Sequence, residues 1–466
     1  MRGPIHYFFL HGLEKNLTSI LRMIKQVYLV RKISKKLVVH VSIFLIVSFL
    51  FSGQFISYST SSRNDWPLSR HDTSSTGFSN STAPIPSVVQ LWNYTIEESP
   101  SSPPAFPVVV DGRVYFVSAD SNIYCLEGST GTKVWNFSTG GTTDSCPAVI
   151  DSRVYVGSAD GYVYCLDASS GTQVWNHSVG VSVDSPVNFV TGRVYVESKT
   201  GDVYCLDAIS GEKLWNFSTG ADADRHSLAI SGNHIFATNS NGDVFCLDVV
   251  SGVSVWNFTV GDSVSSPVAV DRFVYFGSRN GNAYCLDASD GVKIWNYTTW
   301  YNSAGPSHNY HWGNVVSAPA VAYGNVFVGS SDFDVFCLDA MTGLHVWNFS
   351  TNGEVYLPPT VADGCVFAGS YDGYVYCLNA SSGIEIWRYA AGVFSRINVA
   401  GSAGSPVVAE GVVYVVGNGV LFALGSPFSD STFPSFEVIF VVVFVIIAAS
   451  IGIYAYSKRR HEGRYQ

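Results

Sequence analysis

The stretch VYCLDASSGTQVWN, from Val163 to Asn176, decides the fold because the chain repeats variants of it at a nearly constant interval. Its tryptophan has equivalents separated by 43, 40, 40, 41, 39, 52 and 40 residues. A period near 40 residues is typical of chains built from repeated supersecondary units. The equivalent tryptophans are Trp92, Trp135, Trp175, Trp215, Trp256, Trp295, Trp347 and Trp387. The sequence therefore predicts a repeat fold.

One repeat, from Asp144 to Gly180, contains four short runs rich in β-branched and aromatic residues, which favour strands. The runs are Pro147–Ile150, Arg153–Gly157, Tyr162–Leu166 and Gln173–Asn176. Asp160-Gly161 lies between the second and third runs and is typical of a two-residue hairpin turn. Each repeat is thus expected to form a four-stranded antiparallel meander, the size of one propeller blade.

The number of blades follows from the ends of the repeat region. Seven repeats are complete, whereas the eighth, at 404–424, stops before its fourth strand. A fourth strand without a blade lies at 91–95. Joining the two closes a ring and removes exposed sheet edges, which an open solenoid would leave. We therefore predict an all-β, eight-bladed β-propeller of four-stranded antiparallel blades over residues 87–425.

Cysteine recurs at one position of the repeat, and alanine replaces it in the last copy, at Ala423. This position is expected to require a small apolar side chain against the indole of a neighbouring blade. Cys146 and Cys365 lie elsewhere, and no Cys-x-x-Cys occurs, so we expect buried free thiols rather than disulfides or zinc. The repeated cysteines are Cys125, Cys165, Cys205, Cys246, Cys285, Cys337 and Cys377.

Residues 165–175 resemble the tryptophan-docking motif of the pyrroloquinoline quinone (PQQ)-like propeller repeat family, with Cys where that family usually has Ala. The resemblance covers 65–425 and includes Asp65-Trp66, His71-Asp72, Thr76-Gly77 and Leu91-Trp92. It implies that the eight tryptophans dock the blades together. The family includes quinoprotein dehydrogenases and non-catalytic scaffolds such as the outer-membrane protein assembly lipoprotein, so the resemblance is specific for fold and not for activity.

The residues disfavour an enzyme. By resemblance, a quinoprotein alcohol dehydrogenase would have adjacent cysteines over the cofactor, a calcium site of Glu, Asn and Asp, and an Asp base. This chain has no Cys-Cys pair and no Cys-x-x-Cys-His for an attached haem. We therefore expect no catalytic residues, no metal, and no PQQ with calcium. The type within the family is expected to be membrane-anchored and non-catalytic.

The amino-terminal region has the pattern of an export signal. Residues 1–36 hold eight Lys or Arg and one acid, and the apolar segment 37–56 follows. Such a segment is either a cleaved signal peptide or a retained signal anchor. Residues 57–86 are rich in Ser, Thr and Pro and are expected to be a linker.

The carboxyl-terminal region predicts a membrane anchor. After a linker at 426–437, residues 438–456 form an uncharged apolar segment that is long enough to span a bilayer, and 457–466 is a basic tail. A buried core helix is the alternative, but a propeller has no place for one. Because basic flanks stay in the cytoplasm, we expect an extracytoplasmic propeller at the cell membrane, with both termini cytoplasmic if the first segment is retained.

Charge excludes one class of partner. Residues 37–457 carry 14 Lys or Arg and 34 Asp or Glu, a net charge of −20. A surface this acidic disfavours binding to nucleic acid. N-glycosylation sequons in the outward-facing region are candidate modification sites if the host glycosylates. They are Asn80, Asn93, Asn136, Asn176, Asn216, Asn257, Asn296, Asn348 and Asn379.

A binding site is expected where the loops between blades meet at one mouth of the ring. The longest such loop, at 298–317, contains a cluster of ring-bearing residues that would suit a sugar, a planar ligand or a protein partner. The alternative is a plug packed over the channel. The cluster is Trp300, Tyr301, His308, Tyr310, His311 and Trp312, whose two histidines are only a weak metal signal.

Charged residues on the other mouth loops are further candidates. Arg225, His226 and Arg396 could bind an anionic ligand. Acids that could complete a metal site, although they more often face only water, are Asp144, Asp184, Asp222, Asp224, Asp262 and Glu354. The expected function is non-catalytic binding of an extracytoplasmic protein or glycan. A PQQ-dependent dehydrogenase and a structural cell-envelope glycoprotein are the alternatives.

Overall fold

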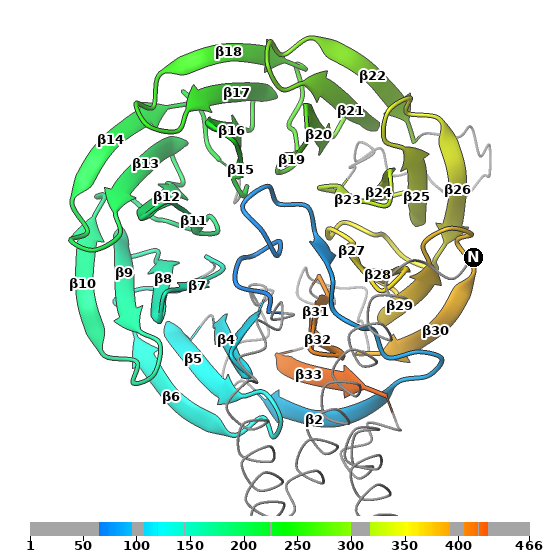
Figure 1. The fold of residues 1–466 in the computed structure, drawn as a ribbon, viewed down its shortest axis with the longest axis horizontal. Helices are drawn as coiled ribbons and strands as arrows, with labels where there is room; N and C mark the ends of the chain where they lie inside the picture. The colour runs from blue at the N-terminus through cyan, green and yellow to red at the C-terminus, as the bar shows by residue number, and fades with distance from the viewer. Residues whose placement is uncertain are drawn as a thin grey trace, which may run out of the picture. The chain divides into compact units, whose positions relative to one another are not determined.

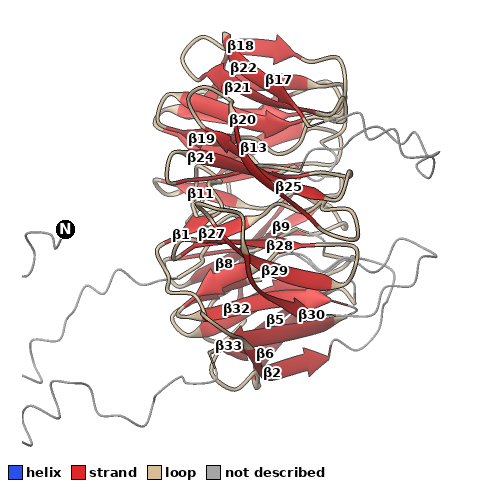
Figure 2. Cartoon of the chain, turned by 90° about the vertical axis from the view of Figure 1, so that its right-hand side faces the viewer, coloured by secondary structure: helices blue, strands red, loops and turns tan. Residues whose placement is uncertain are grey.

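The computed structural model describes residues 65–95, 107–118, 120–143, 145–223, 226–299, 317–391, 405–417 and 419–426. These residues contain strands and no helix, and the strands form eight sheets around a common axis (Figures 1 and 2). The predicted all-β, eight-bladed propeller of four-stranded antiparallel blades is therefore confirmed. The predicted segments at 1–36, 37–56, 438–456 and 457–466 lie outside the described residues.

Each of the first seven blades is built from four consecutive strands, ordered from the axis to the rim (Figure 1). The first four blades consist of β3 (Val108–Val110), β4 (Arg113–Val117), β5 (Asn122–Glu127) and β6 (Lys133–Ser138); β7 (Ala148–Ile150), β8 (Arg153–Gly157), β9 (Tyr162–Asp167) and β10 (Gln173–Ser178); β11 (Asn188–Val190), β12 (Arg193–Glu197), β13 (Asp202–Asp207) and β14 (Lys213–Ser218); and β15 (Ala229–Ser231), β16 (His234–Thr238), β17 (Asp243–Asp248) and β18 (Ser254–Thr259).

The remaining blades follow the same plan, except that the eighth takes its outer strand from the start of the chain. They consist of β19 (Val268–Val270), β20 (Phe273–Gly277), β21 (Asn282–Asp287) and β22 (Lys293–Thr298); β23 (Ala320–Ala322), β24 (Asn325–Gly329), β25 (Asp334–Asp339) and β26 (His345–Ser350); β27 (Thr360–Ala362), β28 (Cys365–Gly369), β29 (Tyr374–Asn379) and β30 (Glu385–Ala390); and β31 (Val407–Ala409), β32 (Val412–Gly417), β33 (Val420–Gly425) and β2 (Val89–Thr95).

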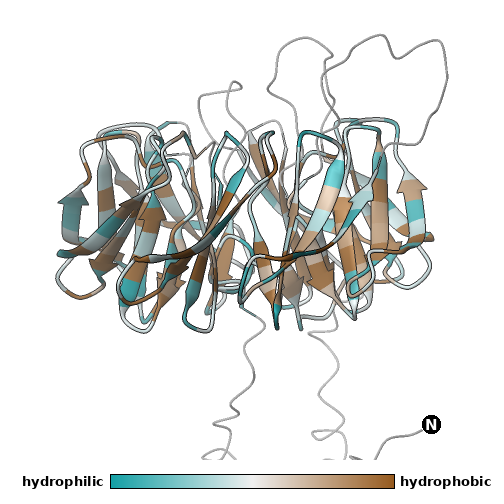
Figure 3. Cartoon of the chain, turned by 90° about the horizontal axis from the view of Figure 1, so that it is seen from above, coloured by the Kyte–Doolittle hydropathy of each residue, from teal (hydrophilic) through white to brown (hydrophobic). Residues whose placement is uncertain are grey.

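Hydrophobic patterning explains why the second and third strands are interior and the fourth lies at the rim. In the second blade, β8 is buried at four of its five positions, whereas β10 buries only its tryptophan. Figure 3 shows the same contrast, with hydrophobic residues concentrated along the inner strands. Blades with two apolar faces must pack against each other, and this requirement produces the ring.

Each rim tryptophan joins its blade to the next one. The Trp135 indole Nε1 donates to the Ala168 carbonyl at 3.0 Å, and its ring lies over Gly171 in the turn after β9. A Cβ at Gly171 would lie 2.6 Å from the ring, and its φ is +70°, so glycine is required. The same pairs are Trp92 with Gly131, Trp175 with Gly211, Trp215 with Gly252, Trp256 with Gly291, Trp295 with Gly343, and Trp347 with Gly383.

The repeat cysteine differs from the expectation in its main neighbour. Cys165 has Trp175, the tryptophan of its own blade, as its cross-strand partner, while the indole of the preceding blade lies over the turn glycine. All nine cysteines are buried and none forms a disulfide. The position still requires a small side chain, because Ala423 pairs with Trp92 in the same way.

The ring closes through β2, which pairs antiparallel with β33 and places Trp92 opposite Ala423. This is the closure that the sequence predicted, with strands from the two ends of the repeat region completing one blade. Trp387, the last repeat tryptophan, donates instead to the Pro84 carbonyl at 2.7 Å. The residues just before β2 therefore replace the turn that receives the indole in the other blades.

Residues 66–82, which we call the axial segment, pass through the centre of the ring (Figure 1). The sequence predicted a linker at 57–86, and this part of the expectation is wrong. Trp66 exchanges two backbone hydrogen bonds with Val109, and β1 (Phe78–Ser79) pairs parallel with β27. The innermost strands have free edges, and the axial segment satisfies their amides. Further amide donors to its carbonyls are Val149, Ile230, Ala269, Val321 and Val361.

The antiparallel meander gives the ring two distinct faces. The loops between blades and the turns between second and third strands lie on one face, which we call the mouth face. The turns between first and second strands and between third and fourth strands lie on the other, the base face. Asp65 accepts from the Asp111 amide in a base-face turn, and Ser426 follows the base-face end of β33. Both ends of the described propeller therefore lie at the base face.

The base face carries exposed apolar side chains in the turns between third and fourth strands of five consecutive blades. We call these residues the apolar arc, and they are between 57% and 86% exposed. They are Ile209, Val250, Val253, Val292, Met341, Leu344 and Ile384. The matching turns of the first two blades carry Ser and Thr instead, as at Ser169 and Ser170. Within the described ranges no helix could cross a membrane.

Candidate functional site

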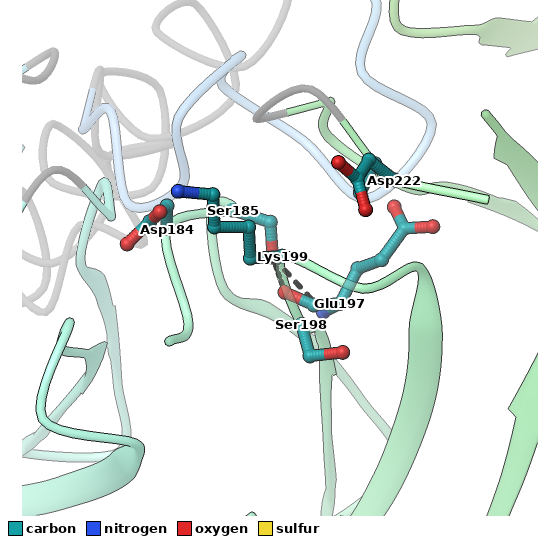
Figure 4. A pocket seen from close by; sticks show the side chains of 7 residues that line it. Asp184, Ser185, Glu197, Ser198, Lys199 and Asp222 are labelled. Atoms are coloured by element: carbon teal, nitrogen blue, oxygen red, sulfur yellow. Dashed lines mark hydrogen bonds between the residues drawn. The ribbon is translucent and has the colours of Figure 1, made fainter. Parts of the chain in front are cut away.

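A cavity of about 420 Å³ opens on the mouth face at the third blade, between the two loops that join this blade to its neighbours. Its wall combines two loops that join blades with the end of β12 and the turn that follows it (Figure 4). Two of the acids predicted at the mouth, Asp184 and Asp222, are brought together here. The lining residues are Asp184, Ser185, Glu197, Ser198, Lys199, Asp222 and Ala223.

Glu197 is the residue that makes this cavity different from its equivalents. Its position at the end of the second strand is glycine in the second blade, Gly157, and in the fifth, sixth and seventh blades. A Cβ on Gly157 would lie 2.4 Å from the Val183 side chain of the adjoining loop. In the third blade Ala223 occupies the loop position that corresponds to Val183. The smaller alanine leaves room for the larger glutamate, so the two replacements compensate in volume.

Ser185 fixes the backbone at Glu197. The Ser185 hydroxyl accepts from the Glu197 amide at 2.9 Å and donates to the Glu197 carbonyl at 2.6 Å. The second blade has the related bond from the Gly157 amide to the Ser145 hydroxyl, at 3.2 Å. The same serine–backbone hydrogen bond therefore holds the loop to the strand end in both blades. The third blade differs in carrying the Glu197 side chain at that strand end.

The Glu197 side chain is fully buried, and neither carboxyl oxygen has a hydrogen-bond partner. Burial raises the pKa of this carboxyl well above its ordinary value, and the negative charge of Asp202 on β13 raises it further. A buried carboxyl without a partner is costly to keep ionised. Both effects therefore favour the neutral form of this carboxyl.

The other charges divide the cavity into two sides. In Figure 4 the amino end of Lys199 extends toward Asp184, whereas the carboxylate of Asp222 faces that of Glu197. Asp222 and Lys199 are exposed, and Asp184 is half-buried. Neither Glu197 nor Asp222 forms an ion pair with a cation among the described residues. The side that holds Glu197 and Asp222 can thus stabilise a positive charge.

A second buried charge, Arg70, lies in the axial segment. Its Nη2 donates to the Pro319 carbonyl, and Nη1 has no partner. Burial lowers the pKa of Arg70 to about 10, and nearby Asp72 offsets part of this effect. Arg70 was not among the predicted anion-binding residues. Because it fastens the axial segment to the innermost edge of the sixth blade, its role here is structural.

Most of the predicted binding residues lie outside the described ranges, namely Trp300, Tyr301, His308, Tyr310, His311, Trp312, Arg225 and Arg396. His226 is described, and its Nδ1 lies 3.0 Å from the Thr238 hydroxyl. Asp262 and Glu354 do not line the cavity. In the described part of the chain, no three His, Cys, Asp or Glu side chains are grouped as metal ligands.

Glu197 was missed from the sequence, although a signal was present. Aligning the repeats at the end of the second strand shows Gly157, Gly277 and Gly329 where the third blade has glutamate. The position is buried and uncharged in the other seven blades, so a charged residue there is the deviation that marks the cavity. The mouth acids were predicted as separate loop residues, and their grouping around Glu197 needed the fold.

Solved structures with the same fold include proteins of different function. The crystal structure of BamB from Moraxella catarrhalis is 18% identical, with a TM-score of 0.58, and the match covers 73% of this chain and 100% of that one. Quinohemoprotein alcohol dehydrogenase ADHIIG from Pseudomonas putida HK5 is 15% identical, with a TM-score of 0.63 and coverage of 78% and 80%. The enzyme from Comamonas testosteroni is also 15% identical, with a TM-score of 0.63 and coverage of 82% and 84%. These identities show a shared fold alone.

No curated protein sequence matches the chain. The family model described as outer membrane protein assembly factor BamB matches residues 89–297 and 298–426, which is most of the chain and almost all of the propeller. The described repeats agree with this match, since the first seven blades each carry a turn glycine that packs under the tryptophan of the preceding blade. The chain therefore belongs to the BamB family of PQQ-like propellers.

Proposed function

We propose that this protein is a membrane-anchored, extracytoplasmic propeller that binds a protein or glycan at its mouth face and performs no catalysis. The observation that carries the proposal is the position of the two ends of the propeller. Asp65 and Ser426 both lie at the base face, opposite the mouth. Any tether attached to either end therefore leaves the mouth unobstructed.

The predicted anchor supports this orientation. The sequence predicts a membrane span at 438–456, and only residues 427–437 separate it from Ser426. Eleven residues reach at most about 40 Å when fully extended. A tether this short keeps the base face toward the bilayer and the mouth toward the outside. The signal segment predicted at 37–56, if retained, would attach to the same face through Asp65.

The apolar arc supports the same orientation. Exposed apolar side chains on consecutive blades are unfavourable in water and suit contact with the interfacial region of a bilayer. The residues of the arc lie in base-face turns of the third to seventh blades, and Asp65 and Ser426 lie on the same face. The net charge of −20 outside the basic ends opposes attraction to anionic lipid, so apolar contact rather than charge would hold this face near the membrane.

The enzyme alternative has less support. The dehydrogenases share the fold at 15% identity, and fold does not transfer function. The chain lacks the adjacent cysteines that the resemblance implies for a PQQ site, and the axial segment passes through the centre of the ring along the innermost strands. The residues present do not fit that cofactor, so we assign none. A purely structural role in the cell envelope predicts that no partner is recovered through the mouth face, whereas the proposed binding role predicts that one is.

Two matched cysteine variants test the orientation. Gly180 lies in a mouth-face loop and Gly192 in a base-face turn of the neighbouring blade, and both have a positive φ and open space where a Cβ would lie. Native thiols are buried. In membranes, a bulky impermeant maleimide should label Gly180→Cys about tenfold faster or more than Gly192→Cys, and detergent should equalise the two rates. Equal labelling before detergent would refute the orientation.

The binding role is tested on the same membranes. Replacing Trp300, Tyr310 and Trp312 by alanine should reduce recovery of a crosslinked partner. Adding PQQ with calcium should produce no spectral change or dye reduction with alcohols. Recovery of the same partner at the same yield from the variant would place the contact elsewhere on the mouth face.

A further inference from the structure

We propose that the mouth cavity of the third blade is a binding site for an organic cation, a primary ammonium or a guanidinium group, held between the carboxylates of Glu197 and Asp222. The inference rests on the proposed binding role of the mouth face and names the chemistry of what binds there. It concerns only residues that the structure describes.

The first argument is the geometry of the two acids. Glu197 lines a cavity of about 420 Å³, and its carboxyl is fully buried with no partner for either oxygen. Figure 4 shows the Asp222 carboxylate opposite it, across the cavity. Lys199, the nearest cation of the wall, extends toward Asp184 instead. An arriving ammonium or guanidinium would thus meet the Asp222 carboxylate and the Glu197 carboxyl, neither of which pairs with a described cation, and would favour the ionised form of Glu197.

The second argument is that the cavity replaces a packed contact. In the second blade Gly157 and Val183 fill the equivalent space. In the third blade the large side chain is on the strand and the small one, Ala223, is on the loop. A buried polar group without a partner destabilises the folded chain. Replacing the apolar contact by an unsatisfied carboxyl lowers the stability of the fold, and no described residue pairs with the Glu197 carboxyl to offset this loss. A ligand that pairs with Glu197 would offset it.

The third argument is the proton balance. The charged groups around Glu197 are Asp184, Lys199, Asp222 and Asp202, and burial together with Asp202 favours the neutral form of the free carboxyl. A cation stabilises the ionised form, so binding transfers about one proton from Glu197 to the buffer. Affinity should consequently rise with pH until Glu197 is ionised in the free protein, and should be constant above that pH. A site that acts only through surface charge would release no proton.

An organic cation suits this site better than a bare metal ion. The cavity is large enough for a lysine or arginine side chain or for a short polyamine. Two facing carboxylates with a serine hydroxyl are fewer ligands than hard divalent cations take in proteins, which is six or more oxygens. The same cationic chemistry could come from a free polyamine or from a side chain of a bound protein, and the test below separates these sources.

Calorimetry on the purified full-length chain in detergent tests the proposal, with two probes. One is spermidine, and the other is a neutral-flanked peptide with a single arginine. We expect at least one probe to bind at a ratio of one with release of about one proton, measured in two buffers with different heats of ionisation. Tighter binding of spermidine indicates a polyamine, and tighter binding of the peptide indicates a protein side chain.

Three variants serve as matched comparisons. Glu197→Gln keeps the shape and removes the charge, and it should weaken binding about tenfold or more and abolish proton release. Glu197→Gly combined with Ala223→Val copies the packing of the second blade, so it should fold and lose binding. Asp262→Asn removes an acid on the next mouth loop, outside the cavity, and should bind as the parent does.

Several outcomes would overturn the proposal. They are binding of neither probe, equal binding by Glu197→Gln, and displacement of the probe by calcium alone at the same site. Because the assay is done in detergent, it does not depend on which face meets the membrane. Failure here therefore leaves the labelling test of orientation intact, and failure of that test leaves the cation site intact.

Discussion

At the scale of single residues, the contact between an indole and a turn glycine is the unit that builds the ring. The glycine is needed for two separate reasons, a positive φ and the closeness of the ring, and these can be distinguished because other turn glycines satisfy only the first. Gly171 has φ +70° and lies under Trp135, whereas Gly180 has φ +83° and nothing within 4 Å of a Cβ. The chain thus contains its own control.

We expect Gly171→Ala to lower the free energy of unfolding by about 1–3 kcal/mol more than Gly180→Ala, since both variants strain a left-handed backbone but only the first overpacks an indole. Denaturant unfolding monitored by tryptophan fluorescence measures both. Equal losses in the free energy of unfolding would mean that the structure accommodates a methyl group under Trp135 without destabilisation.

Residue patterns also set the limit of what the sequence could predict. Trp175 and its equivalents repeat with a fixed spacing and therefore reveal the blade, its packing device and its boundaries. Glu197 is a single departure from the repeat, and its meaning depends on Ala223, which is 26 positions away and adjoins it only in the folded chain. The aromatic cluster at 300–312 remains a prediction, since it lies outside the described residues.

At the scale of elements, β2 was predictable and the axial segment was not. The five residues at 91–95 carry the fourth-strand pattern of every blade, so their partner could be deduced from the blade that lacked one. Residues 66–82 have no such pattern, because their carbonyls bind the free amides of other strands regardless of side-chain type. Their Ser and Thr content is typical of a linker as well as of a polar strand edge.

We expect Trp92→Ala to expose the closing strand selectively. Truncating a buried tryptophan costs about 3–5 kcal/mol, and β2 is joined to its blade only by pairing with β33. Hydrogen exchange should therefore accelerate in β2 and β33 before the other blades lose protection.

Trp135→Ala provides the comparison, since it removes an equivalent indole from a blade whose strands are consecutive in sequence. Its loss of protection should be confined to the first two blades. If both variants exchange uniformly over all blades, the closing strand is no weaker than the covalently continuous ones.

At the scale of the whole molecule, the rim, the mouth and the base have different surfaces. The rim strands carry sequons at exposed positions, such as Asn136 and Asn216. Asn379 is different, because it is the last residue of β29, is half-buried and accepts hydrogen bonds from the Ser381 and Ser382 amides of the following turn. The sequence motif is the same at all these asparagines, whereas the fold shows that they differ in exposure and in hydrogen bonding.

In a host that attaches N-glycans, we expect the rim asparagines to be modified and Asn379 to remain free, because its side-chain oxygen already organises the turn. Peptide mass spectrometry after enzymatic deglycosylation in heavy-oxygen water distinguishes them by a mass tag at each modified site. Full occupancy at Asn379 together with empty rim sites would contradict the exposure argument.

The pairing of β2 with β33 has a consequence for biosynthesis. Trp92 leaves the ribosome early, but its partner strand is made about 330 residues later. At roughly 5–20 residues per second, this interval is on the order of tens of seconds. During that time the blades are made one after another until seven are complete, and the closing strand β2 stays without its partner. A chaperone that shields extended, aggregation-prone segments would be needed most in this interval, and its demand would end when the last blade emerges.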